Sequence, residues 1–275
     1  MSGLYLPATL ARRIGAVALL VAFVLFITLP FVMVLLEAFG SEWFGMRLLP
    51  KVWTLKWFGW AAETVDIGHV LINTAVIAIL ATIVSLLLAI PAAWAIARYR
   101  LPLQSLLMGA ILFPRMIPEI TFALGVARIS YNLGLNNSYI GVALAHVILA
   151  APFAVLVLTS TFEGMDDRLL EAGTVLGCNS VQLFRRVIVP LALPGIVAAA
   201  LFSFLSSYND FVLTLMVYGA DTVTLPVQTY LSIGNGYLSV AGAISVILLI
   251  PSFLFLLALM RMVKPENLLG GLKGA

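Results

Sequence analysis

Long apolar stretches separated by short polar segments dominate the chain. A helix needs about 20 apolar residues to cross the hydrocarbon core of a bilayer. Strand-length segments that alternate apolar and polar residues are absent, so helices are the only spanning structure available. The sequence therefore predicts an all-α membrane protein with six transmembrane helices, in a membrane domain at residues 14–262 between tails at 1–13 and 263–275. The expected spans are residues 14–36, 70–97, 104–127, 138–161, 190–217 and 238–262.

The segment at residues 162–189 is a polar, charged region between two of these spans. Asp166 and Asp167 can cap the N-terminus of a helix over residues 168–176. Gly177 suits the left-handed conformation with which many helices end. A first short helix is therefore expected outside the bilayer.

A second short helix is expected directly after that turn. Asn179, followed three residues later by Gln182, resembles a capping box. Pro190 is expected to stop this helix because proline lacks an N–H group. Together the two helices predict a helix–turn–helix in the loop.

This loop resembles the EAA loop of permeases from binding-protein-dependent ABC importers. The family pattern is Glu-Ala-Ala or Glu-Ala-Gly, then Gly after three residues, then an aliphatic-x-aliphatic-Pro element nine residues later. The chain carries Glu171-Ala172-Gly173, Gly177 and Val187-Ile188-Val189-Pro190. It departs mildly from the pattern, with Gly173 where a second Ala is usual and Val189 where Leu is usual. An amphipathic cytoplasmic loop of another membrane protein is the alternative interpretation.

The resemblance implies roles for individual residues of the loop. In such permeases the loop is the coupling element, which sits in a groove of the ATP-hydrolysing subunit. Glu171 would contact a basic group on that subunit, and Gly177 would permit the close turn. Leu169, Ala172 and Leu176 would form the docking face, although these apolar residues could instead pack on the ends of the chain's own spans.

The resemblance covers residues 65–262 and implies a complete importer that works by alternating access. The implied partners are two ATP-binding subunits, a second permease chain related to this one, an extracytoplasmic substrate-binding protein and the lipid bilayer. The chain has no G-x-x-x-x-G-K-[S/T] phosphate loop, so ATP and Mg would be bound by the partner ATPase. No cofactor and no catalytic activity are therefore expected in this chain.

The branch of the family, and with it the substrate, is indicated less clearly. Residues 151–153, 163–170 and 208–211 look most like the spermidine/putrescine branch, whereas residues 115–118 and 270–274 are closer to the sugar branch. We prefer a polyamine such as spermidine or putrescine, with a sugar or another small organic solute as the alternative. A remoter alternative is a secondary transporter or channel that works without ATP. Such proteins often contain two similar halves, and no convincing internal repeat is evident.

Composition and charge support a membrane protein. Hydrophobic residues make up 63% of the chain and charged residues only 10%, against about a quarter in soluble domains. A net charge of +3 is too small and dispersed to indicate nucleic acid as a partner. Cys178 is the one cysteine, so no internal disulfide can form, and His69 and His146 lack metal-ligand spacing.

Lysine and arginine set the expected orientation. With the N-terminus inside, four of these residues fall outside and ten fall inside, which the positive-inside rule favours. Both termini and the loop at 162–189 are therefore predicted to lie in the cytoplasm, and the resemblance implies that the membrane is a bacterial inner membrane. The outside set is Arg47, Lys51, Lys56 and Arg128, and the inside set is Arg12, Arg13, Arg98, Arg100, Arg168, Arg185, Arg186, Arg261, Lys264 and Lys273.

Ionisable residues within spans are costly and are candidates for function. Arg115 and Glu119 are four residues apart and bracket Pro118, which favours a structural ion pair around a kink. His146 is interpreted as a neutral histidine that is hydrogen-bonded between helices.

Tyr208, Asn209 and Asp210 form a second polar group, towards the outer half of the fifth span. Asp210 has no obvious partner nearby in the sequence, so it either caps the next helical segment or faces a polar route. For a polyamine, we hypothesise that Asp210 faces the pathway and that Tyr208 offers its ring to the passing ammonium group.

Tryptophan is concentrated in the connection at residues 40–68. Trp53, Trp57 and Trp60 are spaced as on one face of a helix, which favours an amphipathic segment at the membrane surface. Stacking on a sugar or cofactor is the less favoured interpretation.

The orientation can be tested with reporter fusions. Because ten of the fourteen loop and tail cations lie on one side, the N-terminus and the loop should face the cytoplasm. A reporter found outside after Asn179 would contradict a coupling role for the loop. Fusions should report the periplasm after Gly40, Leu135 and Asn235, and the cytoplasm after Arg100, Asn179 and Gly274.

Overall fold

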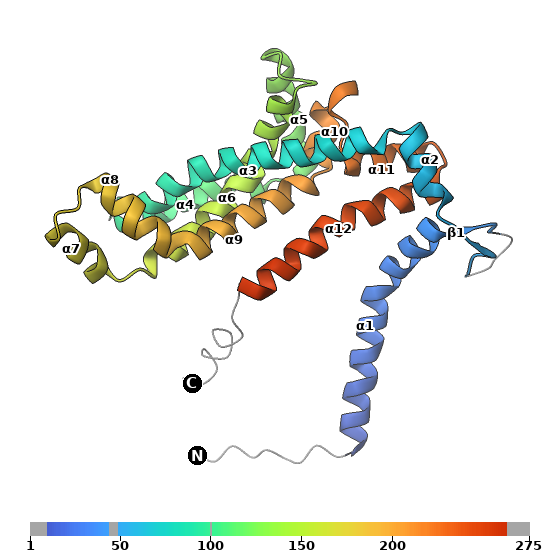
Figure 1. The fold of residues 1–275 in the computed structure, drawn as a ribbon, viewed down its shortest axis with the longest axis horizontal. Coiled ribbons are helices and arrows are strands. Elements are labelled where there is room, and N and C mark those ends of the chain that lie inside the picture. Colours follow the sequence, from blue (N-terminus) through green and yellow to red (C-terminus); the bar gives the residue numbers. More distant parts are fainter. Residues whose placement is uncertain (1–9, 44–48, 100, 263–275) are drawn as a thin grey trace.

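The computed structural model describes residues 10–43, 49–99 and 101–262 (Figure 1). Five helices are long and apolar enough to cross a membrane, or six if a bent helix pair counts as one span. Most of the expected tails at 1–13 and 263–275 falls outside the described residues, as do Arg47 and Arg100.

The spanning helices agree with four of the six predicted spans and differ in the other two. The long helices are α1 (Leu10–Phe39), α3 (Ile67–Arg98), α6 (Tyr139–Glu163), α9 (Val189–Tyr208) and α12 (Leu238–Met262). The bent pair is α4 (Gln104–Met116) and α5 (Glu119–Asn132). The shorter elements are β1 (Gly40–Ser41), β2 (Val52–Trp53), α2 (Lys56–Thr64), α7 (Asp167–Val175), α8 (Ser180–Leu183), the π-helix η1 (Phe184–Ile188), α10 (Val212–Val217), the 3₁₀ helix η2 (Ala220–Thr222) and α11 (Leu225–Gly234).

The third predicted span, 104–127, is not one continuous helix. Its two halves, α4 and α5, meet at an angle of 95°. Pro118 disfavours helical geometry in the residue before it, and Ile117 is extended with φ −84° and ψ 140°. The proline therefore breaks the helix instead of kinking it, and α5 projects from the bundle beside α10 (Figure 1).

The fifth predicted span, 190–217, is also interrupted. α9 ends at Tyr208, and α10 begins four residues later, at Val212. The Asp210 carboxylate accepts a hydrogen bond from the Thr214 backbone N–H at 3.0 Å. The acid thus satisfies a backbone donor in the first turn of α10, which is the capping role foreseen for it.

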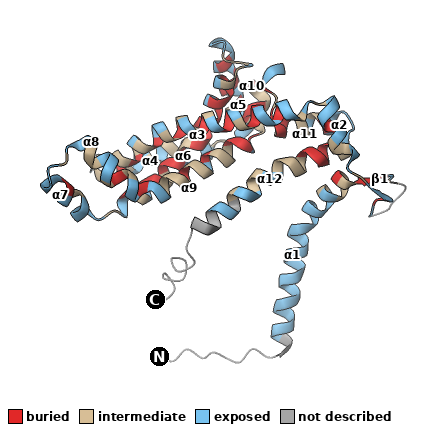
Figure 2. Ribbon diagram, viewed as in Figure 1, coloured by how far each residue is buried: buried red, intermediate tan, exposed pale blue. Residues whose placement is uncertain are grey.

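α6 is the central helix of the bundle. In its most apolar stretch 61% of the residues are buried, against 28% for α3 and none for α1. α3 and α9 pack along α6 (Figures 1 and 2). The buried residues at these contacts include Ala93 on α3, and Leu158 and Phe162 on α6. α1 leaves this bundle and packs mainly on α12, so it is almost wholly exposed (Figure 2).

The tryptophan-rich connection packs on the chain itself. Trp57 Nε1 donates a hydrogen bond to the Gly40 carbonyl at 2.7 Å, and the Trp60 ring lies 4.9 Å from that of Tyr237. Trp53 belongs to β2, which pairs with β1. The prediction that all three tryptophans share one helix face is therefore wrong for Trp53, because the short β pairing holds it before α2 begins.

A glycine at the contact of α6 and α9 allows these helices to approach closely. A Cβ at Gly195 would lie only 2.8 Å from Thr161 Cβ. Close contacts of this kind between small residues are typical of helix packing in membranes.

Gly195→Ala should therefore destabilise the α6–α9 contact, by about 1–3 kcal/mol as for other overpacked sites. The measurement is the thermal unfolding midpoint of the purified protein in detergent. Gly125→Ala, on α5, is the matched control, because a Cβ there meets no atom within 4 Å. Equal midpoints for the two variants would contradict the packing argument.

Candidate functional site

The loop between α6 and α9 forms the expected helical hairpin at one end of the bundle (Figure 1). Asp166 caps α7 by accepting a hydrogen bond from the Arg168 N–H at 2.9 Å. Gly177 has φ +83°. The Cys178 N–H bonds to the Gly173 carbonyl at 3.1 Å, and the Gly177 N–H bonds to the Thr174 carbonyl at 3.0 Å. These two bonds form a Schellman motif, so the predicted role of Gly177 in ending the helix is confirmed.

The second arm of the hairpin begins as predicted but does not end at Pro190. Asn179 Oδ1 accepts from the Gln182 N–H at 2.8 Å, and Gln182 Oε1 accepts from the Asn179 N–H at 3.1 Å, which completes the capping box. Beyond it, α8, η1 and α9 form one continuous helix of 29 residues. The Val189 N–H bonds to the Phe184 carbonyl, five residues back. This π-helical turn shifts the bonding register just before Pro190, so the helix tolerates the missing N–H group.

The hairpin exposes the residues that the resemblance assigns to docking. Glu171 and Ala172 are exposed on α7. Leu176 is 84% exposed and its neighbour Val175 is 87% exposed, while Leu169 is also exposed. Leu176 therefore does not pack on the chain's own spans, which was the alternative, whereas Leu169 is partly covered at 48% exposed. Sequence reasoning missed Val175, although it continues the apolar tip of the hairpin.

Gly173 has a packing reason that explains the departure from Glu-Ala-Ala. It is buried, and a Cβ at this position would lie 2.6 Å from Leu183 Cδ1. α7 and the second arm thus touch directly where the motif usually has alanine. Glycine here brings the two arms of the hairpin together.

Arg98, at the end of α3, ties the hairpin to the bundle. Its guanidinium donates to the Met165 carbonyl at 3.0 Å and forms an ion pair with Asp167. The group also lies over the Trp94 ring, 5.5 Å from its centroid. Sequence reasoning used Arg98 only to set orientation, because a contact between residues 98 and 167 leaves no local pattern.

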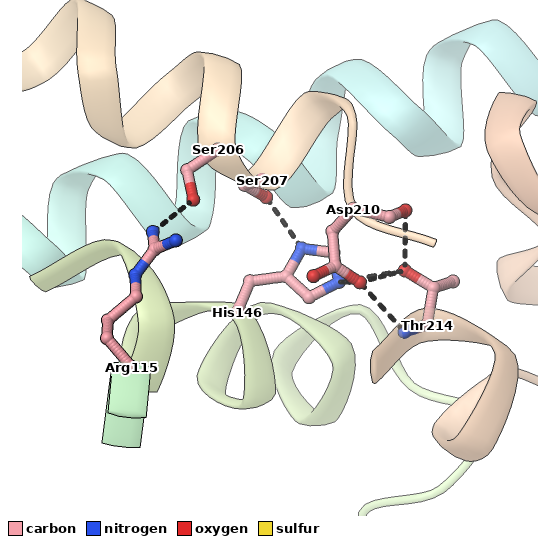
Figure 3. A network of polar contacts seen from close by, with 6 residues as sticks. All are labelled: Arg115, His146, Ser206, Ser207, Asp210 and Thr214. Carbon is pink, nitrogen blue, oxygen red and sulfur yellow. Dashed lines mark hydrogen bonds and ion pairs between the residues drawn. The ribbon is translucent and has the colours of Figure 1, made fainter. Parts of the chain in front are cut away.

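A network of polar side chains crosses the bundle where α9 breaks (Figure 3). His146 on α6 has Nδ1 at 2.7 Å from Ser207 Oγ, and Nε2 at 2.8 Å from Thr214 Oγ1 and 3.3 Å from Asp210 Oδ1. A neutral imidazole with its proton on Nε2 can donate towards Asp210 while Nδ1 accepts from Ser207. The interpretation of His146 as hydrogen-bonded between helices is confirmed.

The same network corrects the expectations for Asp210 and Tyr208. Asp210 is only 8% exposed and has His146 and Thr214 as partners, so the view that it lacks a local partner is wrong. Tyr208 is 1% exposed and its ring stacks on Phe204, with centroids 5.5 Å apart. In this conformation neither group is open to a passing solute. The third residue of this group, Asn209, is exposed.

The expected ion pair of Arg115 with Glu119 does not form in the described part of the chain. The 95° break at Pro118 removes the continuous helix that would bring residues four apart together. Arg115 instead donates from Nε to the Leu149 carbonyl at 2.8 Å and from Nη2 to Ser206 Oγ at 3.1 Å. Its guanidinium lies 4.2 Å from the centroid of the Phe153 ring.

Within the described ranges, no cluster of three or more His, Cys, Asp or Glu residues could hold a metal ion. The candidate site has two parts: an exposed hairpin outside the bundle and a polar network inside it.

Comparison with known proteins gives a family that fits this arrangement. Residues 85–266, more than half of the chain, match the family "Binding-protein-dependent transport system inner membrane component". The trehalose transport system permease protein SugB of Mycobacterium tuberculosis (strain CDC 1551 / Oshkosh) is 32% identical, over 74% of this chain and 76% of its own length. The spermidine/putrescine transport system permease protein PotC of Escherichia coli (strain K12) is 25% identical, over 85% of this chain and 88% of its own length.

A solved structure shares the fold. It is the crystal structure of a bacterial ABC transporter involved in the import of the acidic polysaccharide alginate, with a TM-score of 0.73. The similarity covers 96% of this chain and 100% of that chain at 20% identity. The family match rules out the remoter alternative of a transporter or channel that works without ATP. The chain belongs to the binding-protein-dependent transport system inner membrane component family, as a multi-pass, non-catalytic permease subunit of an ABC importer.

Proposed function

We propose that this chain forms half of the solute pathway of its importer and that the hairpin at α7 and α8 couples it to an ATP-hydrolysing subunit. The observation that carries the proposal is the exposed apolar tip of Val175 and Leu176 beside the acid Glu171. Large apolar side chains clustered outside the membrane favour burial against a partner. A short helix that offers such a face suits a groove on another protein.

Each arm of the hairpin is connected to a membrane helix, so movement of the hairpin would move the bundle. Arg98 holds its first arm to α3, and its second arm is continuous with α9. Two ATP-binding subunits that close on ATP and Mg would move both permease chains through such hairpins and so drive alternating access. The hairpin and both chain ends would then face the cytoplasm of a bacterial cell, as the distribution of Lys and Arg predicts.

The remaining partners are a second, related permease chain and an extracytoplasmic binding protein. α1 is apolar and exposed along most of its length, and an open apolar cavity of about 530 Å³ lies between α1 and α12. A second permease chain has room to pack there. A relative by fold was solved in complex with an alginate pentasaccharide-bound periplasmic protein, which supports a partner of that kind.

The cargo is a small polar organic solute, for which polyamines and sugars are the two candidates. Similarity to PotC supports a polyamine, and the exposed acid Glu119 fits one. Similarity to SugB supports a sugar. Burial of Asp210 counts against its hypothesised place on a polyamine route, which needs an open carboxylate.

Coupling can be tested by changing the hairpin. Glu171→Ala should leave the complex assembled in the membrane but lower both ATP hydrolysis stimulated by the loaded binding protein and transport, by about tenfold, since it removes a charged contact. Gly177→Val should do more harm, because a β-branched residue resists the φ of +83° at this position.

Glu163→Ala is the matched control for the hairpin variants, since it removes an exposed acid at the end of α6, outside the motif. It should transport normally. Normal stimulated hydrolysis by Glu171→Ala and Gly177→Val at normal expression would mean that the hairpin is not the docking element.

The role of Asp210 can be tested by two substitutions, because the two hypotheses predict different orders of uptake for them. If a cation passes this carboxylate, Asp210→Asn should impair uptake more than Asp210→Glu, which keeps the charge. If Asp210 only holds His146 and the start of α10, Glu should be at least as harmful, because an extra methylene overpacks a buried site. Uptake is compared at equal insertion and equal basal ATP hydrolysis.

A further inference from the structure

Arg115 is a charged residue held near the middle of the bundle. Its Nε bonds to the carbonyl of Leu149, which lies ten residues after the start of α6 at Tyr139 and fourteen before its end at Glu163. At 1.5 Å per residue these positions are about 15 Å and about 21 Å away along the helix. The guanidinium therefore lies at the depth of the hydrocarbon core if α6 spans the bilayer.

Three contacts fix the direction of this side chain, and Figure 3 draws the one to Ser206. The Leu149 carbonyl and Ser206 Oγ each accept one N–H, and the Phe153 ring covers one face of the guanidinium. An arginine has five N–H donors, and these contacts use two of them. Arg115 remains exposed, so the rest of its charge faces outward.

The surface around Arg115 is unsuited to lipid. A charged side chain at the bilayer centre costs about 2.5–3.5 kcal/mol even on insertion scales. Glu119 and Asn209, at the two helix breaks, are exposed as well. Interrupted backbone at membrane depth is tolerated only within protein or against a water-filled cavity. This polar face therefore fits a hydrated route between two permease chains.

We propose that Arg115 is a fixed positive charge on the solute route, where it donates hydrogen bonds to hydroxyl or carboxylate groups of a neutral or acidic saccharide. The proposal rests on the proposed function, because it needs the route between two permease chains. Asp210 does not bond to Arg115, since its carboxylate is buried against His146 and Thr214. Glu119 is the exposed acid at the same break, but it forms no ion pair with Arg115 in the described part of the chain. The free N–H donors of Arg115 are therefore available to a solute.

The local charge can be measured at Ser206, whose Oγ lies 3.1 Å from Arg115 Nη2. A single thiol is placed there by Ser206→Cys in a chain that also carries Cys178→Ser. The complete complex in lipid nanodiscs, without ATP, is then treated with two methanethiosulfonates, one carrying a sulfonate and one carrying a trimethylammonium group. The ratio of the two reaction rates reports the local potential, because the thiolate fraction is common to both.

The anionic reagent should react faster relative to the cationic one when Arg115 is present. Arg115→Gln should lower this ratio about fivefold or more, whereas Arg115→Lys should keep it near the parent value, since a lysine retains the charge. Cys178 in the otherwise unchanged chain is the matched control, and its ratio should not respond to Arg115→Gln. A Ser206→Cys thiol that reacts with neither reagent, or a ratio unchanged in Arg115→Gln, would overturn the proposal.

The solute class is tested with three soluble probes in the same assay. Trehalose and glucuronate should slow labelling of the Ser206→Cys thiol more than spermidine does, because only they carry groups that accept from Arg115 without adding positive charge. Slowing by spermidine that equals or exceeds theirs would overturn the assignment. Failure of the proposed coupling appears separately, as unstimulated ATP hydrolysis in a complex whose labelling ratio still responds to Arg115.

Discussion

A peptide group in hydrocarbon must find its hydrogen-bond partner within the protein, and this requirement governs the structure around the two helix breaks. At Ile117–Pro118 and at Asn209–Phe211 the helical ladder stops. At the second break Asp210 accepts from the Thr214 N–H at the start of α10, and beside the first break Arg115 donates to a carbonyl of α6.

These contacts place the charged residues of the bundle where they are. Asp210 is close to His146 because α10 begins there, and His146 in turn reaches Ser207 on α9. Arg115 reaches α6 and α9 because α4 ends at the first break. The charged groups beside the two breaks therefore differ in access. Asp210 is buried against His146 and Thr214, whereas Arg115 is exposed.

Much of the fold follows from sequence pattern, while the breaks do not. Apolar length locates α1, α3, α6 and α12, and the caps of the hairpin follow from Asp166, Gly177 and Asn179, because these signals are local. Hydropathy cannot distinguish a continuous helix from one broken by Pro118, since both are equally apolar. The expectation that Pro190 stops the helix was also wrong, because the π-helical turn before it lets the helix continue.

The candidate site shows the same difference between features that are local in sequence and contacts that are distant in it. The exposed motif at Glu171 to Gly177 could be recognised from sequence because all of its residues lie within one short segment of the chain. The partners of Arg115, Asp210 and Arg98 on other helices could not, because they lie between 34 and 91 residues away along the chain. The expected Arg115–Glu119 pair was wrong for that reason: spacing of four implies contact only on an unbroken helix.

The continuity of α8, η1 and α9 has a mechanical consequence. A rod of 29 residues is about 43 Å long, so a tilt of about 5° imposed at the hairpin displaces its far end by roughly 4 Å. That far end is Ser206 and Ser207, where the rod meets Arg115 and His146. The helix itself ends at Tyr208, immediately after these two serines. A displacement of this size exceeds the length of a hydrogen bond, so a small rotation at the surface is enough to exchange partners deep in the bundle.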